Sequence, residues 1–259
     1  MPEATYRTGT PVWTDLTSSD PQRIIPFYTE LFGWGAEDGG DPQYGGYVTF
    51  TLHGKPVAGL GPQQEGNPYG NLWTVYIASD DASATAGKAA AAGGQVMLPA
   101  MQVGDQGTLA LLADPAGAVV GLWQPDQHAG FAYQDEPGAP VWFETMSRNF
   151  PAALDFYRNV FEWDYTTEAD TDDFRYSTAT IDGSPVAGVM DAARFLPEGV
   201  PSFWQFYIGV GNADATVEAA TRLGGSVVEA PQDSPYGRIA TIADPLGAML
   251  RIDEPPAGN

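Results

Sequence analysis

The sequence predicts an α+β protein of four βαβββ modules, paired into two open, curved-sheet barrels with the helices outside. The first observation behind this prediction is that the chain repeats itself. Trp13 and Trp142 are 142 − 13 = 129 residues apart, and so are Trp34 and Trp163, with 163 − 34 = 129. The second is that each half contains a strand, a helix and three strands, in that order, twice. An offset held over most of the chain indicates two copies of one domain.

The repeat also sets the expected domain boundaries. Later in each half the offset is 204 − 73 = 131 for Trp73 and Trp204, and 244 − 114 = 130 for Asp114 and Asp244. The segment QPDQHAGFAYQDEPGA at 124–139 is polar and rich in turn-forming residues, which is typical of a linker. We therefore predict a first domain over 8–124, a linker over 125–138 and a second domain over 139–255, with modules at 10–60, 71–123, 140–190 and 203–253.

The first module begins with a strand and a helix. WTDLTSSD at 13–20 has apolar or β-branched residues typical of a short strand, and Asp20 and Pro21 follow as a helix N-cap and first helical residue. The helix is expected to end near Gly33. Pro26 removes a backbone donor inside it, so we expect a kink or a 3₁₀ start. The apolar face of this helix consists of Phe27, Tyr28, Leu31 and Phe32.

The rest of the first half follows the same order. YVTFTLHGKPVAGL at 47–60 predicts two strands around a His-Gly turn. LWTVYIASDD at 72–81 begins a second module with a strand and an Asp cap, before the Ala-rich helix at 82–94. Helices on one face of a sheet leave the other face free to curl around a cavity. Strands close this module near 95–98, 107–113 and 117–123.

Composition limits the possible classes of protein. The chain has 259 residues, of which 43% are hydrophobic, so a globular fold is expected. It has no cysteine, which excludes disulfides, thiolate metal sites and a cysteine nucleophile. No stretch reaches the roughly 18 apolar residues of a membrane span, and the N-terminus lacks the apolar region of a signal peptide. We therefore expect a cytoplasmic protein that is a monomer or a homodimer.

The charge is strongly acidic. Thirty-three Asp and Glu residues against 11 Lys and Arg residues give a formal net charge of −22. Such a charge repels nucleic acid and anionic membranes, so neither is expected as a partner. Two interpretations remain: the charge serves solubility, or it favours cationic ligands.

The repeated module resembles the vicinal oxygen chelate superfamily, which includes glyoxalase I, bleomycin-resistance proteins and extradiol dioxygenases. The resemblance lies in the strand, the Asp or Asn cap, the FY pair and the DPAG and DPLG turns at 114–117 and 244–247. It covers nearly the whole chain, and the chain looks in particular like the four-module, two-domain, glyoxalase-like or hydroxylase-like members common in actinobacteria. The resemblance implies the open barrels, and it implies a small molecule as ligand.

In the metal enzymes of that superfamily, the first strand of a module supplies His or Gln seven residues before the cap. A Glu follows seven residues after the Asp of DPxG. These side chains hold a divalent ion. Counting from Asp20, Asp81 and Asp114 gives Trp13, Thr74 and Gly121, and counting from Asn149, Asn212 and Asp244 gives Trp142, Gln205 and Arg251. Only Gln205 could bind a metal, so we predict no metal site and no cofactor.

The two histidines support the same prediction. His53 falls in the hairpin turn, where the second half has Asp182, and His128 falls in the linker. We therefore expect neither to face a cavity.

Because side chains alternate along a strand, residues an even number of positions from the superfamily's metal-ligand positions in the same strand should also face inward. Gly121 is small and could leave room for a ligand, whereas Glu144 and Arg251 could form a salt bridge that fills the second cavity. The predicted ligand-binding residues are Trp13, Asp15, Thr74, Tyr76, Gly121, Trp123, Trp142, Glu144, Gln205, Tyr207 and Arg251.

Each of these residues also has a structural interpretation. Trp13 and Trp142 could be core residues, and Asp15 and Glu144 could be bonded to backbone amides instead of acting as general bases. The sequence favours a glyoxalase- or bleomycin-resistance-like protein that binds a small aromatic or cationic molecule without a metal ion. The alternative is a glyoxalase-like lyase, isomerase or hydroxylase/oxygenase, and a third interpretation is a scaffold without a ligand. The sequence does not decide whether the protein is an enzyme.

Overall fold

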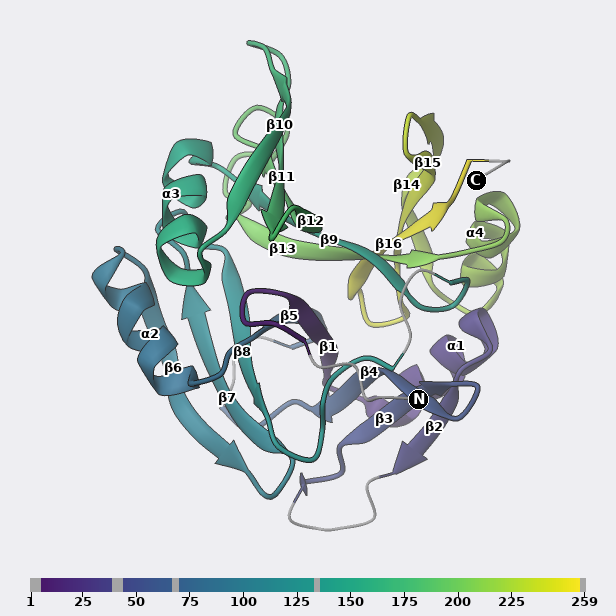
Figure 1. Ribbon diagram of the computed structural model, residues 1–259. Helices are drawn as coiled ribbons and strands as arrows, with labels where there is room; N and C mark the ends of the chain where they lie inside the picture. The colour runs from purple at the N-terminus through teal and green to yellow at the C-terminus, as the bar shows by residue number, and fades with distance from the viewer. Residues whose placement is uncertain (1–5, 39–43, 67–69, 133–135, 257–259) are drawn as a thin grey trace. The chain divides into compact units, whose positions relative to one another are not determined.

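The computed structural model describes residues 6–38, 44–66, 70–132 and 136–256. Its elements follow the predicted order four times, which confirms the α+β class and the βαβββ modules (Figure 1). The first half contains β1 (Pro11–Ser18), α1 (Pro21–Phe32), β2 (Gly35–Asp38), β3 (Val48–Leu52), β4 (Lys55–Pro62), β5 (Leu72–Ala78), α2 (Ala82–Ala91), β6 (Gln95–Val103), β7 (Gly107–Ala113) and β8 (Val119–Pro125). The second contains β9 (Pro140–Ser147), α3 (Phe150–Phe161), β10 (Asp164–Asp170), β11 (Arg175–Ile181), β12 (Ser184–Asp191), β13 (Phe203–Gly209), α4 (Ala213–Arg222), β14 (Ser226–Ser234), β15 (Gly237–Ala243) and β16 (Met249–Glu254).

The strands form two open, mixed sheets of eight strands each. Their orders are β2-β3-β4-β1-β5-β8-β7-β6 and β10-β11-β12-β9-β13-β16-β15-β14. In each module the opening strand runs parallel to the closing strand, as in the pair β1 and β4, and the remaining pairs are antiparallel. No helix in the described ranges is long and apolar enough to cross a membrane.

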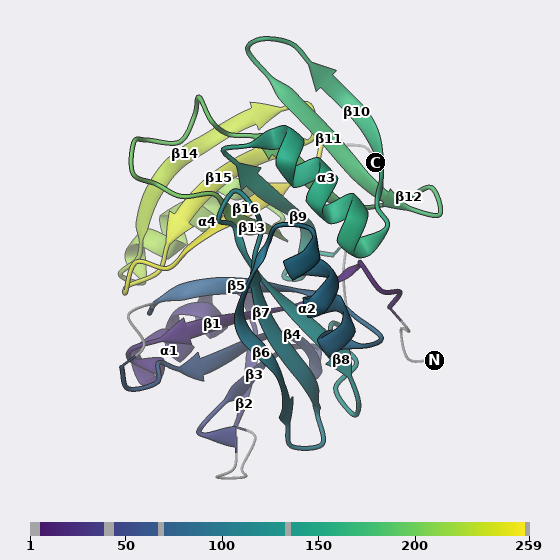
Figure 2. The same ribbon diagram turned by 90° about the vertical axis from the view of Figure 1, so that its left-hand side faces the viewer.

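The chain divides into two compact units, each of which takes modules from both halves. Unit 1 comprises Met1–Trp13, Val75–Gly130 and Trp142–Gln205, and unit 2 comprises Thr14–Thr74, Phe131–Val141 and Phe206–Asn259. Within unit 1, α2 and α3 pack side by side (Figures 1 and 2). Within unit 2, α1 packs on α4. The domain boundaries expected from the sequence stay a prediction.

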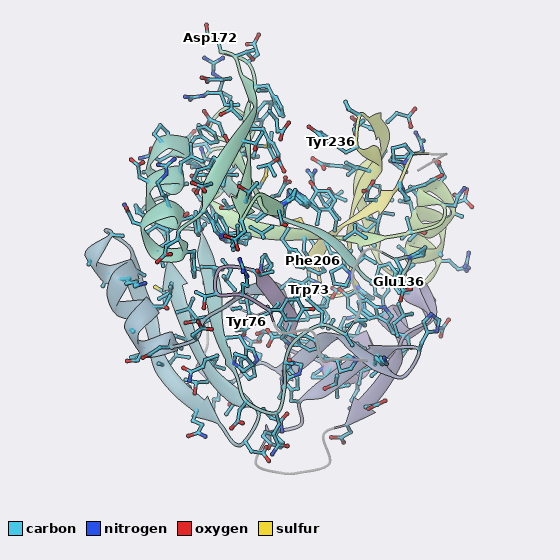
Figure 3. All side chains as sticks on the ribbon, in the orientation of Figure 1. Trp73, Tyr76, Glu136, Asp172, Phe206 and Tyr236 are labelled. Atoms are coloured by element: carbon cyan, nitrogen blue, oxygen red, sulfur yellow. The ribbon has the colours of Figure 1, made fainter. Side chains whose placement is uncertain are left out.

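The repeated FY motif explains the packing inside unit 2. Phe27 and Tyr28 are buried on α1. The Tyr28 hydroxyl donates to Asp244 Oδ2 at 3.2 Å and accepts from Trp73 Nε1 at 3.1 Å. Trp73 also packs edge-on against Phe206, with ring centroids 5.1 Å apart (Figure 3). The FY motif of the first half therefore binds the DPLG turn of the second half.

Unit 1 repeats this arrangement with the halves exchanged. The Tyr157 hydroxyl on α3 donates to Asp114 Oδ2 at 3.1 Å and accepts from Trp204 Nε1 at 2.7 Å. Burial raises the pKa of Tyr157 and Asp114 above their usual values. The hydroxyl therefore stays protonated and donates to the carboxylate.

The Trp that ends each FY motif anchors the segment preceding a first strand. In unit 2, Trp34 Nε1 donates to the carbonyl of Gly138 at 2.7 Å, and in unit 1 Trp163 Nε1 donates to the carbonyl of Gly9 at 2.9 Å. Both glycines have φ near +90° (89° and 94°), which favours glycine. Of the predicted apolar face of α1, Phe27 and Tyr28 are buried, whereas Leu31 and Phe32 are partly exposed.

The start and the end predicted for α1 are confirmed, whereas the helix predicted over 82–94 ends at Ala91. Asp20 Oδ1 accepts from the backbone N–H of Arg23 at 3.3 Å, and Gly33 ends α1 with φ of 70°. Of the two expected effects of Pro26, the 3₁₀ start is wrong, because the segment is α-helical from Pro21 onward, and the kink stays a prediction. Pro26 leaves the carbonyl of Gln22 without its helical donor, and both residues are exposed, so water can replace the missing bond.

Candidate functional site

The predicted ligand-binding residues are distributed over both units. Trp13, Tyr76, Trp123, Glu144 and Tyr207 are buried. Five others, including Trp142 and Arg251, are partly exposed, and Gly121 is buried in β8. Unit 1 holds Trp13, Tyr76, Gly121, Trp123, Trp142, Glu144 and Gln205, whereas unit 2 holds Asp15, Thr74, Tyr207 and Arg251.

Four side chains of unit 1 form what we call the Glu144 cluster: Trp142, Glu144, Tyr176 and Gln205. The Glu144 carboxylate is 4% exposed and accepts from the Tyr176 hydroxyl at 3.0 Å and from Gln205 Nε2 at 2.5 Å. Trp142 Nε1 donates to the same Tyr176 hydroxyl at 2.9 Å. The cluster therefore joins three of the predicted residues: Gln205 binds Glu144 directly, and Tyr176 links Glu144 to Trp142. It holds a carboxylate near a partly exposed indole.

In unit 2, Asp15 and Tyr47 of the first half are the equivalents of Glu144 and Tyr176. The Tyr47 hydroxyl donates to Asp15 Oδ2 over a long 3.4 Å. Asp15 lies opposite Gly59 in the parallel pair of β1 and β4, as Glu144 lies opposite Gly188 in β9 and β12. The carboxylates are thus bonded to tyrosine hydroxyls, whereas the sequence suggested backbone amides.

The tyrosine hydroxyl lies directly over the strand glycine. A Cβ added at Gly59 would be 1.7 Å from Tyr47 Oη, whereas one added at Gly61 would be 3.5 Å from Tyr47 Cδ2. We expect Gly59→Ala to lower the free energy of unfolding by about 1–3 kcal/mol, because Tyr47 must leave Asp15. Gly61→Ala in the same strand should stay within about 0.5 kcal/mol of wild type. Urea unfolding of both variants tests this placement of Tyr47, and equal effects would contradict it.

The room predicted beside Gly121 is occupied. A Cβ added at Gly121 would be 2.1 Å from Cδ1 of Tyr76, so the Tyr76 ring lies over this glycine. Tyr76 and Gly121 are also direct register partners in β5 and β8. This part of unit 1 is therefore filled by a side chain of the protein itself.

His128 is a residue that the sequence interpretation missed. It was expected to lie in the linker without facing a cavity, and the structure adds that its ring packs edge-on against Trp13 and Trp123, with centroids 4.3 Å and 5.6 Å apart. The His128 carbonyl accepts from Trp123 Nε1 at 2.7 Å. Burial lowers the pKa of His128 to about 4, so the imidazole is neutral at pH 7. Sequence position alone gave no indication of this packing.

The buried imidazole makes stability depend on pH. The unfolded chain binds a proton at His128 near pH 6.5, whereas the folded chain binds it only near pH 4, so this group costs stability as the pH falls through that window. We expect the free energy of unfolding of His128→Phe to rise by about 2 kcal/mol relative to that of wild type when the pH falls from about 7 to 5. Urea unfolding at both pH values measures this difference.

Other groups change the stability in the opposite direction as the pH falls, so the effect of His128 is taken as the difference between His128→Phe and wild type. Burial raises the pKa of Asp253 to about 6, so the folded state gains stability from protonating that carboxyl as the pH falls. A pH-independent difference between His128→Phe and wild type would contradict the buried, neutral imidazole.

A row of polar side chains crosses β13, β16, β15 and β14 in unit 2. Arg251 donates from Nη1 to the Tyr207 hydroxyl at 3.1 Å and from Nη2 to Glu229 Oε2 at 2.9 Å. The Thr241 hydroxyl donates to the same Glu229 oxygen at 2.6 Å. These residues are register partners across the strands. The predicted Glu144–Arg251 salt bridge would join the two units and stays a prediction.

The residues at the superfamily's metal positions do not match a divalent ion. The aromatic, hydroxyl, glycine and guanidinium groups found there are poor ligands or none, and the Gln205 amide is hydrogen-bonded to Glu144. Within the described ranges, no group of three or more His, Cys, Asp or Glu side chains could hold a metal ion. No catalytic step through a metal can be derived from these residues.

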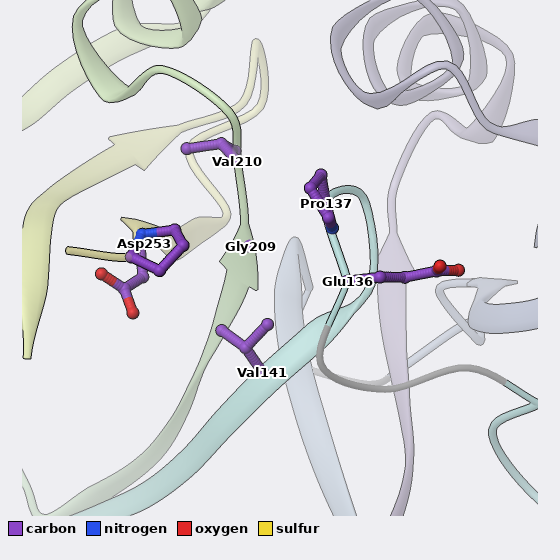
Figure 4. A pocket seen from close by; sticks show the side chains of 7 residues that line it. Glu136, Pro137, Val141, Gly209, Val210 and Asp253 are labelled. Atoms are coloured by element: carbon purple, nitrogen blue, oxygen red, sulfur yellow. The ribbon is translucent and has the colours of Figure 1, made fainter. Parts of the chain in front are cut away.

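Unit 2 contains a cavity of about 220 Å³ (Figure 4). Glu136 and Asp253 lie toward opposite ends of its lining, with Val141 and Gly209 between them. Gly209 allows the linker to approach β13, because an added Cβ would be 3.2 Å from the carbonyl oxygen of Glu136. The lining residues are Glu136, Pro137, Val141, Gly209, Val210, Asp253 and Pro255.

Comparisons with known proteins agree with this architecture. The family model of the Glyoxalase/Bleomycin resistance protein/Dioxygenase superfamily matches residues 10–122 and 140–252. The chain is 39% identical over 254 residues to "Putative glyoxylase CFP32" of Mycobacterium bovis, with 96% of each chain covered. It is 37% identical over 265 residues to "Anthracycline biosynthesis protein DnrV" of Streptomyces peucetius, covering 96% of this chain and 94% of the relative.

Solved structures show the same fold at low sequence identity. A Mn(II)-bound glyoxalase from Novosphingobium aromaticivorans has a TM-score of 0.65 at 16% identity, covering 96% of this chain and 82% of the other. A 2,2',3-trihydroxybiphenyl 1,2-dioxygenase from Sphingomonas wittichii has a TM-score of 0.61 at 13% identity, covering 96% and 91%. At these identities the likeness concerns the fold alone.

Proposed function

Because the chain belongs to the glyoxalase/bleomycin resistance protein/dioxygenase superfamily, we propose that it binds a small aromatic or cationic molecule without a metal ion. The observation that carries this proposal is the Glu144 cluster of unit 1. Its carboxylate is held in one orientation by Tyr176 and Gln205, next to the indole of Trp142. Recognition there needs no metal donor.

The chemistry of the cluster suits a ligand that combines a ring with a positive charge. An indole face attracts a cation through the ring quadrupole, and a carboxylate with low exposure adds a charge-assisted contact. Because Trp142 and Gln205 are partly exposed, the edge of the cluster can be reached from solvent. The net charge of −22 adds a long-range attraction for cations.

The relatives support a small molecule but not one particular reaction. One is named for anthracycline biosynthesis, which supports an aromatic ligand, and another is named a glyoxylase. The second name favours the alternative function, a glyoxalase-like lyase, isomerase or hydroxylase/oxygenase. Without a metal, such an enzyme would need an acid–base pair, and Asp15 with Tyr47 is one pair of the required type.

Titration of benzyltrimethylammonium into chelator-treated protein tests the proposal. We expect saturable binding that Glu144→Gln weakens roughly tenfold to a hundredfold, because a charged contact is lost. Trp142→Leu should also weaken binding, whereas the exposed Glu168→Gln removes a charge elsewhere and should not. Equal affinities in Glu144→Gln and Glu168→Gln would overturn the assignment to this cluster.

An assay for turnover separates the two functions. Methylglyoxal–thiol adducts offered before and after chelation should not be converted if the protein is a metal-free binding protein. Turnover that survives chelation and disappears in Asp15→Asn would favour the acid–base alternative. Turnover that disappears on chelation would favour a metal enzyme.

A further inference from the structure

The duplication allows the two copies to be compared position by position, and they differ at the end of the last strand. Trp123 in β8 corresponds to Asp253 in β16, because 253 − 123 = 130. The residues that follow confirm this alignment by their contacts. Gln124 Oε1 accepts from the backbone N–H that opens α2 at 2.9 Å, and Glu254 Oε2 accepts from the one that opens α4 at 2.8 Å.

A glycine in the neighbouring strand supports the same alignment. A Cβ added at Gly107 of β7 would be 2.6 Å from Trp123 Cζ2, and one added at Gly237 of β15 would be 2.1 Å from Asp253 Oδ1. Both side chains therefore run over a glycine of the adjacent strand. The two positions therefore share a strand position and a neighbouring glycine, and they differ in the side chain.

The smaller side chain leaves space in unit 2. In unit 1 the Trp123 indole is 6% exposed and bonds to the carbonyl of His128, so it fills its site. In unit 2 the equivalent position is an Asp, and a cavity of about 220 Å³ lies beside it (Figure 4). This volume equals that of about seven water molecules at ~30 Å³ each, which is enough for a small ring compound.

Asp253 is the acidic side chain at this cavity, whereas the side chain of Glu136 points away from Val141 and Asp253 (Figure 4). Oδ1 of Asp253 has no hydrogen-bond partner within the described part of the chain. Burial and then the neighbouring Glu254 raise the pKa of Asp253 to about 6, as expected for a carboxylate without a compensating charge. The remaining lining is mostly apolar and includes Val141 and Val210.

We propose that this cavity binds a small aromatic or heterocyclic amine, whose ring occupies the space that Trp123 fills in unit 1 and whose ammonium contacts Asp253. The apolar walls would take the ring, and the ammonium would supply a positive charge beside Asp253. Glu136, Val141 and Asp253 are partly exposed, so a ligand can enter from solvent. The site lies in unit 2 and does not depend on the function proposed for the Glu144 cluster.

Tryptamine is a suitable probe, since it joins an indole to an ammonium. We expect calorimetry to show one tryptamine bound at this site, and tryptophol, which has a hydroxyl in place of the ammonium, to bind roughly tenfold to a hundredfold more weakly. Asp253→Asn keeps the size of the side chain and removes its charge, and should erase the difference between the two probes. Asp253→Trp copies the first half and should abolish binding of both.

A control variant checks that the effect belongs to Asp253. Glu168→Gln, at an exposed position outside both proposed sites, should leave the tryptamine affinity unchanged. If Asp253→Trp does not fold, Asp253→Asn alone decides. Unchanged tryptamine affinity in Asp253→Asn, or no binding to the wild-type protein, would overturn the proposal.

Discussion

Residues 1–130, produced without the rest of the chain, are expected not to form a stable monomer. Each compact unit takes modules from both halves, so the isolated first half would lose the partner of each of its helices. Tyr28 on α1 would lose Asp244, and Asp114 would lose Tyr157. These groups are buried, and leaving them without partners costs about 1–3 kcal/mol each, in addition to the lost apolar contacts.

The duplication suggests how the fragment would respond. Two copies of the first half could supply each other with the missing contacts, Tyr28 of one copy binding Asp114 of the other, because the motifs are equivalent. Sedimentation velocity and urea unfolding should therefore find a dimer or an unfolded chain. Adding residues 131–259 as a separate chain should restore a 1:1 complex. A monomeric fragment as stable as the full chain would show that the halves fold independently.

Asp244→Ala is expected to lower the free energy of unfolding by about 3 kcal/mol or more. Asp244 Oδ1 accepts from the backbone N–H of Leu246 at 2.8 Å and of Ala248 at 3.0 Å, and Oδ2 accepts from Tyr28. The substitution removes all three bonds and leaves a fully buried hydroxyl beside an empty space.

Matched variants separate this effect from the loss of a charge. Asp114→Ala should cost about as much, because Asp114 makes the equivalent bonds to Ala116, Ala118 and Tyr157. Asp80→Ala, at an exposed position, should stay within about 0.5 kcal/mol of wild type. Urea midpoints of the three variants provide the measurement. If Asp244→Ala were no more destabilising than Asp80→Ala, the turn would not anchor the FY helix.

The modules could be predicted because each carries several independent local patterns. Caps such as Asp20, apolar faces and His-Gly or Asp-Gly turns are local, and four copies reinforced one another. The strand β2 (Gly35–Asp38) had no such pattern, since all four of its residues are exposed. The partnership of modules could not be predicted either. A constant offset reveals a duplication but does not say which module packs on which.

The candidate site was predicted only in part, for a similar reason. The alternation of side chains along a strand predicted Glu144 and Gln205, which are bonded to each other. It did not predict Tyr176, which links them to Trp142. The repeat held a sign of this tyrosine, since 176 − 47 = 129 relates it to Tyr47. Glu229 carried no such sign, because its role comes from strand register alone.

Metal-free recognition is tested most directly by elemental analysis combined with titration of benzyltrimethylammonium before and after chelation. We expect no stoichiometric divalent ion in the purified protein and an affinity that chelation leaves unchanged. A bound ion at one equivalent per chain, with binding that chelation abolishes and that added metal restores, would contradict recognition by the Glu144 cluster alone.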